Sequence, residues 1–242
     1  MTGRRVFAAA LAVTVAAVVA PGAGAAAASP RVQLLVAGRT RVLAAPRFVR
    51  AAATTLTVGR RRCTVGAATP LAALAALRRG GGPAFRLRDY GSCSRRPADS
   101  AALFVTQIGA DRNRRADGWV YKVGRRVPSI GAADPSGRGL RGGDRLTWFY
   151  CRAQSSGGCQ RTLEVSALSS AAQPLRVLVR GYDDNGRAVP VAGATVSASA
   201  QTAVTGADGT ASFPAFGAPT TRAVDAQRAG MVPSFPVRVA SA

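Results

Sequence analysis

The chain has 242 residues, a length typical of one large domain or two small ones, and 33 Lys and Arg against 11 Asp and Glu give it a formal net charge of +22. It contains no histidine, which excludes Ser-His-Asp and Cys-His catalysis, histidine-ligated zinc and histidine pH switches. Hydrophobic residues make up 48% of the chain, which is enough to build a folded core.

The start of the chain has the features of an export signal. Arg4 and Arg5 precede an uncharged apolar run over 7–20, and Ala-Gly-Ala at 23–25 fits the small-x-small cleavage pattern. We therefore expect a secretory signal peptide over 1–28 and a protein that is secreted, extracellular or associated with the cell wall. The apolar run is shorter than the roughly 20 residues of a membrane span, so no stable span is expected after cleavage. Retention of the segment as an anchor is the alternative.

One helix and several short strands are predicted next. Thr69 is a good N-cap, Pro70 suits the first helical position, and leucines three residues apart follow, so a short amphipathic helix is expected to end at Gly80. The predicted strands around this helix cover 32–36, 55–58, 62–65, 85–87 and 103–108.

Aromatic residues are concentrated in two further strands. Trp119 and Tyr121 lie two residues apart, as do Trp148 and Tyr150, so each pair shares one face of its strand. We expect the two strands to be neighbours. Aromatic residues in strands usually pack in the core. The alternative is a ligand-binding platform on which a planar ring or a sugar stacks, with all four as candidate binding residues and Tyr121 as the ring most exposed to solvent.

Three short motifs of this region resemble a known family. They are G-W-x-Y-x-V at 118–123, G-A-x-D at 131–134 and G-D-x-L-x-W-x-Y-C at 143–151. Together they resemble the bacterial family similar to the C-terminal domain of transcobalamin, over about 32–165. The resemblance implies a β-grasp fold and a binding module rather than a catalyst. It does not imply cobalamin as the ligand, because the helical barrel that accompanies this domain in transcobalamin has no counterpart here.

The charge changes abruptly along the chain. Residues 31–161 carry 24 Arg and one Lys against six Asp, a net charge of +19, whereas 172–242 carry six Arg and four Asp, a net charge of +2. The Ser/Ala-rich segment 166–172 lies near this change and is a natural linker. We therefore expect two units, 31–168 and 174–242.

Short strands separated by Gly-containing turns predict a β-sandwich for the second unit. Its motifs, G-R-A-V-P-V-A-G-A-T-V at 186–196, T-G-A-D-G-T-A at 205–211 and A-G-M-V-P-S at 229–234, resemble carboxypeptidase-regulatory-like, transthyretin-like modules. The resemblance implies an immunoglobulin- or transthyretin-like sandwich that acts as a spacer or adhesion unit. The whole chain is thus expected to be mainly β, an α+β unit followed by an all-β unit.

The four cysteines predict two disulfide bonds, because exported proteins meet an oxidising compartment. Three connectivities are possible, and we favour Cys63–Cys93 and Cys151–Cys159, which are sequential and close short loops. A thiolate metal site is not favoured, since closely spaced cysteine pairs are missing. The aspartates of the second unit suit turns rather than a calcium site. No bound metal is expected.

The basic residues of the first unit support two interpretations. Arg112, Arg114 and Arg115 are candidate polyanion-binding residues. A coding preference for Arg explains the basic runs as well, because Lys122 is the only lysine in the chain. Nucleic acid is not an expected partner for an exported protein.

No catalytic constellation is evident, because the aspartates neighbour Gly, Arg or Pro and suit turns or ion pairs. We expect neither enzymatic activity nor a cofactor. Two hypotheses remain. In the first, a secreted binding protein presents a β-grasp module for an unknown small molecule on a sandwich spacer. In the second, a structural or adhesive envelope protein binds anionic cell-envelope polymers through its Arg-rich first unit.

Overall fold

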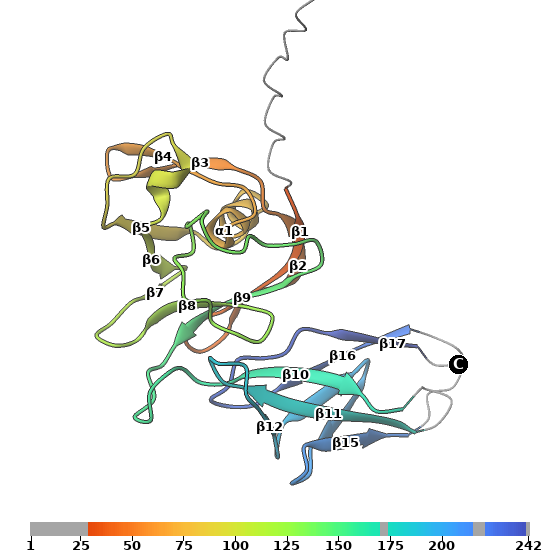
Figure 1. The fold of residues 1–242 in the computed structure, drawn as a ribbon. Helices are drawn as coiled ribbons and strands as arrows, with labels where there is room; N and C mark the ends of the chain where they lie inside the picture. The colour runs from red at the N-terminus through yellow and green to blue at the C-terminus, as the bar shows by residue number, and fades with distance from the viewer. Residues whose placement is uncertain (1–28, 170–173, 215–220, 241–242) are drawn as a thin grey trace, which may run out of the picture.

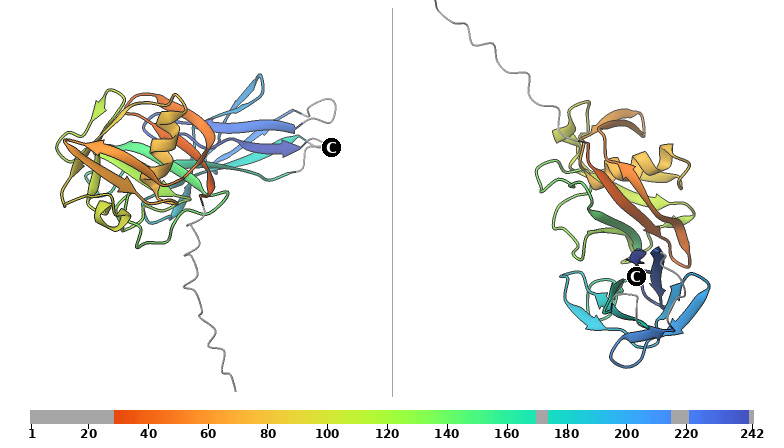
Figure 2. Two further views of the ribbon diagram at one scale, coloured as in Figure 1. Left: turned by 90° about the horizontal axis from the view of Figure 1, so that it is seen from above. Right: turned by 90° about the vertical axis from the view of Figure 1, so that its right-hand side faces the viewer.

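The computed structural model describes residues 29–169, 174–214 and 221–240, and this part of the chain is mainly β, as the sequence predicts. Its strands form two bodies with separate hydrophobic cores (Figures 1 and 2). The expected signal peptide, 1–28, lies outside the described residues. No helix in the three described ranges has the length and apolar character needed to cross a membrane.

A four-stranded mixed sheet organises the first unit. Its strands, in spatial order, are β2 (Val42–Arg50), β1 (Arg31–Ala37), β9 (Arg145–Cys151) and β8 (Gly118–Val123). The central pair, β1 and β9, runs parallel, whereas both outer pairings are antiparallel. Gln33 pairs with Arg145 and Ala37 with Phe149, so two segments more than a hundred residues apart form the middle of the sheet.

The predicted helix, α1 (Pro70–Arg79), packs on one face of this sheet (Figure 1). Its N-terminus is capped as expected, because the Thr69 side chain accepts a hydrogen bond from the Ala72 N–H at 3.2 Å. Burial of the leucine face ties the helix to the core, where Leu71, Leu74 and Leu77 are all buried.

Two smaller sheets complete the first unit. A hairpin joins β3 (Thr54–Val58) to β4 (Arg61–Val65). A separate three-stranded sheet has the order β5 (Phe85–Asp89), β6 (Leu103–Ile108), β7 (Asp111–Arg112). A short 3-10 helix, η1 (Pro97–Ser100), lies against β4, and Ser100 Oγ donates to the Thr64 carbonyl at 2.6 Å. The disulfide Cys63–Cys93 joins the hairpin to the segment after β5.

The second unit consists of two sheets around one core. The first contains β10 (Thr162–Ala167), β11 (Leu175–Tyr182), β12 (Ala188–Pro190) and β15 (Thr210–Phe213). The second contains β14 (Gln201–Val204), β13 (Thr195–Ala198), β16 (Thr221–Gln227) and β17 (Val237–Ala240). Apolar residues of both sheets share the core, including Val177, Val196 and Val224.

The boundary between the units lies earlier than predicted. Strand β10, which the sequence analysis assigned to the first unit, pairs antiparallel with β11 from Thr162–Tyr182 to Ala167–Val177. Its alternate apolar residues, Leu163 and Val165, are buried in the core of the second unit. The expected linker, 166–172, therefore begins inside a strand of the second unit, since Ser166 and Ala167 belong to β10, and its last residues lie outside the described part.

The other face of the mixed sheet is covered by the second unit. Leu35, Phe149 and Cys151 point away from α1 and pack against Val232 and Phe235. Both faces of β1 and β9 are thus buried, one in the core of the first unit and the other in the joint between the units. Backbone hydrogen bonds fix the segment of the second unit that carries Val232. The Val232 N–H donates to the Arg161 carbonyl, and the Val232 carbonyl accepts from the Leu163 N–H, both at 2.9 Å.

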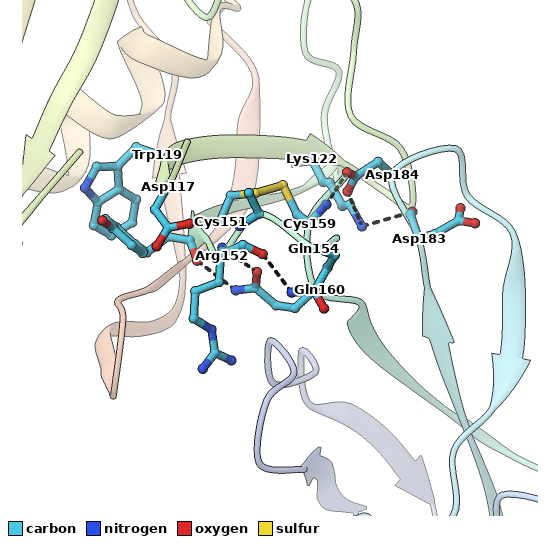
Figure 3. The surroundings of a disulfide bond; sticks show 12 residues. Asp117, Trp119, Lys122, Cys151, Arg152, Gln154, Cys159, Gln160, Asp183 and Asp184 are labelled. Carbon is cyan, nitrogen blue, oxygen red and sulfur yellow. Dashed lines mark hydrogen bonds and ion pairs between the residues drawn. A yellow bond between two sulfur atoms is a disulfide. The ribbon is translucent and has the colours of Figure 1, made fainter. Parts of the chain in front are cut away.

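A buried ammonium group lies at the edge of this joint. The Lys122 side chain is fully buried, and its Nζ donates to the carbonyls of Tyr182 and Asp183 at 3.0 Å and to Thr162 Oγ1 at 3.4 Å (Figure 3). Asp184 Oδ1 lies 3.4 Å from Nζ in ion-pair contact without a hydrogen bond. Burial lowers the pKa of Lys122, and the Asp184 carboxylate opposes that shift. The acceptors around Nζ partly offset the cost of burying its charge.

The disulfide Cys151–Cys159 connects the same joint to the mixed sheet. Cys151 ends β9, and the Cys159 N–H donates to Asp184 Oδ2 at 2.8 Å. The Cα atoms of the two bonded pairs lie 5.3 Å and 5.1 Å apart, within the usual range for a disulfide. Both predicted pairings are confirmed.

We expect the two disulfides to differ in their contribution to stability because they close loops of different length, with sequence separations of 30 and 8. Loop-closure entropy predicts a loss of about 3.6 kcal/mol for C63S/C93S and about 2.5 kcal/mol for C151S/C159S. Urea unfolding of both variants under non-reducing conditions measures the two losses. A larger loss for C151S/C159S would contradict the expectation and would show that the short bridge stabilises the contact between the two units rather than only closing a loop.

Candidate functional site

The four aromatic candidates of the sequence analysis lie together in the core of the first unit. Trp119 is the cross-strand partner of Tyr150, and Tyr121 is the partner of Trp148. The ring centroids of these pairs are 5.8 Å and 5.4 Å apart. The expectation of neighbouring strands is therefore confirmed. All four residues are buried, and Tyr121, expected to be the most exposed, retains only 7% of its surface.

The polar edges of these rings are already bonded inside the protein. Trp119 Nε1 donates to the Asp111 carbonyl at 2.8 Å, Tyr121 OH to Ile130 at 2.8 Å, and Tyr150 OH to Arg112 at 2.9 Å. Burial raises the pKa of Tyr121 to about 12, assisted by the Asp134 charge. These contacts are typical of core aromatics, and they fix the orientation of the rings.

Two exposed aromatic residues that were not predicted as site residues lie on the β5–β6–β7 sheet, Phe104 in β6 and Tyr90 directly after β5. Tyr90 and Phe104 are 63% and 45% exposed, and their rings meet edge to face with centroids 6.1 Å apart. The Arg88 guanidinium stacks over Tyr90, 4.8 Å from the ring centre. Phe104 lies between the buried Leu103 and Val105 in β6, so its side chain points out of the core. An aromatic residue at such an outward-facing strand position is the sequence feature that could have predicted this site.

An open groove of about 590 Å³ lies beside this aromatic pair. Its lining combines the exposed rings with four arginines, two from β5 and two from the loop that begins at β7: Arg86, Arg88, Arg112 and Arg115. We call it the arginine groove. Of the predicted polyanion residues, Arg112 and Arg115 line it and Arg114 does not. Arg86 and Arg88 were not predicted as site residues, although they alternate along β5 and so share its outer face.

The arginines of this groove have few internal partners. Within the described ranges, four ion pairs are formed, and none includes an arginine of this groove. The Arg112 Nε donates to Gln107 Oε1 at 2.8 Å. One acidic residue, Asp117, also lines the groove, and its Oδ1 accepts a hydrogen bond from the Ala153 N–H at 3.0 Å. The groove is therefore cationic and its guanidinium groups are available to a ligand.

An apolar pocket lies on the other side of the aromatic pair. It has a volume of about 390 Å³, and Tyr90, Phe104 and Trp119 line both it and the arginine groove. Its remaining lining is mostly apolar and includes two more of the predicted aromatic residues, Tyr121 and Trp148, so three of the four candidates reach this pocket. The outer surface of the first unit thus offers a charged site and an apolar site side by side.

Two acidic residues of this unit, Asp89 and Asp134, stabilise turns by accepting hydrogen bonds from nearby backbone N–H groups. Asp89 accepts from the N–H groups of Gly91 and Cys93 and pairs with Arg61, and the backbone hydrogen bonds are the main reason that its pKa is lowered. Asp134 accepts from Ser136, whose hydrogen bonds lower its pKa as well. Across the described residues, no three Cys, Asp or Glu side chains gather as a metal site would require.

Truncating Trp119 to Ala should cost about 3–5 kcal/mol of unfolding free energy, because a large buried ring would be replaced by a cavity and the Asp111 carbonyl would lose its donor. Urea unfolding measures this loss. Tyr90→Ala is the control, since an exposed ring contributes little to stability. Comparable losses for the two variants would contradict the assignment of Trp119 to the core.

Comparison of the chain with models of protein families, with curated proteins and with solved structures found no match.

Proposed function

We propose that the chain is an exported, non-catalytic binding protein whose first unit takes an anionic cell-envelope polymer in the arginine groove. The observation that carries the proposal is the arrangement of four guanidinium groups without carboxylate partners around the exposed Tyr90–Phe104 pair. Guanidinium forks bind carboxylates and phosphates by paired hydrogen bonds, and exposed aromatic faces stack on sugar rings or other planar groups.

Two features support export as part of the proposal. The start of the sequence has the pattern of a secretory signal, and all four cysteines are paired in disulfides, as is usual outside the reducing cytosol. Extracellular polymers with acidic groups would then be the anions that the protein meets at high local concentration.

The architecture is consistent with a binding module mounted on a spacer. The mixed sheet with its parallel central pair and one helix on its face supports the β-grasp assignment for the first unit. The two sheets around one core support the sandwich assignment for the second. In this proposal the second unit is a spacer that extends the chain beyond the binding unit, and it contributes no catalytic group.

A second candidate function is the binding of a small planar molecule. The apolar pocket beside Tyr90 and Phe104 favours it, because an apolar cavity next to charged groups is typical of small-molecule sites. Salt distinguishes the two candidates. Charge-driven binding weakens as ionic strength rises, whereas apolar stacking changes little.

Alginate, a carboxylated polysaccharide, is a suitable probe, with neutral dextran as its uncharged counterpart. We expect alginate to bind the wild type and its affinity to fall at least tenfold between low and moderately high salt. The variant R86Q/R88Q should weaken binding strongly, since it removes two charges from the groove. The matched control R60Q/R62Q removes the same charge from an exposed part of the β3–β4 hairpin that lines neither site and should change binding by less than twofold.

Phe104→Ala tests the aromatic part of the proposal and should also weaken alginate binding. Equal losses in R86Q/R88Q and R60Q/R62Q would show that overall charge, rather than the groove, attracts the polymer. Absence of alginate binding to the wild type at low salt would likewise reject the proposal, and salt-independent binding would favour the small-molecule alternative.

A further inference from the structure

A second cationic cleft lies between the two units and shares no lining residue with the arginine groove. It has a volume of about 690 Å³ and is lined by the loop after β1, by the residue after Cys151, and by a turn of the second unit after β16. Four arginines line it: Arg39, Arg41, Arg152 and Arg228. Three come from the first unit and one from the second.

The charge of this cleft is unbalanced. None of its lining residues is acidic, and none of the four arginines takes part in an ion pair among the described residues. The carboxylate of Asp111 lies near the loop, where its Oδ2 accepts a hydrogen bond from the Arg39 backbone N–H at 2.9 Å. Like charges that line one cleft repel one another, so the arrangement disfavours the empty state and favours an anion.

Backbone hydrogen bonding positions Arg152 in the wall of the cleft. Arg152 follows the disulfide-bonded Cys151, and its N–H donates to Gln160 Oε1 at 2.8 Å. The Gln160 side chain is buried and in turn donates to the Tyr150 carbonyl at 2.7 Å. The side chain of Arg152 then extends from the disulfide towards the second unit (Figure 3).

The opposite wall of the cleft is a tight turn. The Met231 N–H donates to the Arg228 carbonyl at 3.1 Å, and Gly230 has φ +81°, which favours glycine. A Cβ at Gly230 would lie 4.0 Å from a terminal nitrogen of Arg152. The guanidinium of the first unit therefore lies next to the turn that carries Arg228.

The third wall is also fixed by hydrogen bonds. The Gly38 N–H donates to the Arg41 carbonyl at 2.8 Å, which closes the loop that presents Arg39 and Arg41. Together with the Arg39–Asp111 contact, this bond limits the entropy that the loop would lose when a ligand binds. The backbones of all four arginines are thus positioned before any ligand arrives.

We propose that this cleft binds a compact multivalent oxyanion of the condensed-phosphate or phosphate-ester class. Arginine is suited to such groups because its planar fork can bind two oxygens at once. Several guanidinium groups around one cleft favour an anion with several charges over a singly charged one. Because the arginines come from both units, the bound anion would also bridge the joint. This site does not depend on the proposed polymer binding by the arginine groove.

Inorganic tripolyphosphate is the probe, used with the full exported chain in titration calorimetry at low salt. We expect one site per chain and at least tenfold weaker binding by R152Q/R228Q. The control double R60Q/R62Q removes the same charge from the β3–β4 hairpin, where neither arginine lines the cleft or the arginine groove, and it should bind within about twofold of the wild type. Equal weakening in both doubles, or no measurable binding by the wild type, would overturn the proposal.

Thermal unfolding provides an independent readout. Tripolyphosphate should raise the Tm of the wild type because a ligand that binds only the folded state stabilises it, and this shift should disappear in R152Q/R228Q. Without the anion, the variant should be at least as stable as the wild type, since two repelling charges are gone. If replacing the half-buried Arg152 itself unfolds the chain, R41Q/R228Q, which changes only exposed side chains, gives the same test with the same expected loss. A wild-type Tm shift that persists in a folded variant would contradict the assignment.

Discussion

The buried ammonium of Lys122 is the interaction on which the relation between the two units depends. A lysine side chain is almost never fully buried unless it is paired, because removing its charge from water is costly. Here two carbonyls, one hydroxyl and one carboxylate of the second unit surround Nζ. Removal of the ammonium would leave these acceptors buried without a donor, so the contact is specific to this arrangement of the units.

Both faces of the two central strands of the mixed sheet, β1 and β9, are buried. One face packs on α1 and carries the aromatic cluster, and the other packs on Val232 and Phe235 of the second unit. Apolar burial supplies most of the stabilisation across that second face, since it scales with the area removed from water. The Lys122–Asp184 contact and the Cys151–Cys159 bridge then fix the orientation, because polar contacts depend on geometry far more than apolar ones do. The cleft between the units is therefore built on this joint, whereas the arginine groove is lined by the first unit alone.

The sequence contains enough local information to predict much of this fold. The Thr69 cap, the leucine spacing of α1 and the two-residue spacing of the aromatic pairs are local signals, and the structure bears them out. The disulfides follow from the positions of four cysteines in the chain. The membership of β10 could not be read in the same way, because Leu163 and Val165 would suit either core, and only the pairing with β11 decides between them.

The sites were harder to predict than the fold. Which apolar residue stays exposed, as Phe104 does, depends on how three separate sheets pack together. The four arginines of the interdomain cleft come from distant segments of the chain, so their spacing carries no signal. One signal for the joint was present in the sequence. Strands β1 and β9 are each apolar at five of seven positions, with no strict alternation of apolar and polar residues, which is typical of strands buried on both faces.

Differential scanning calorimetry of Lys122→Met tests the central claim most directly, with Arg125→Met as the control. Arg125 pairs with Glu164 across the same joint, but its side chain is 55% exposed, so its loss should cost at most about 1 kcal/mol. We expect the wild type to unfold in one transition. Lys122→Met should lose about 3–5 kcal/mol and separate that transition into two as the units uncouple. A single Lys122→Met transition at the wild-type temperature would contradict the account.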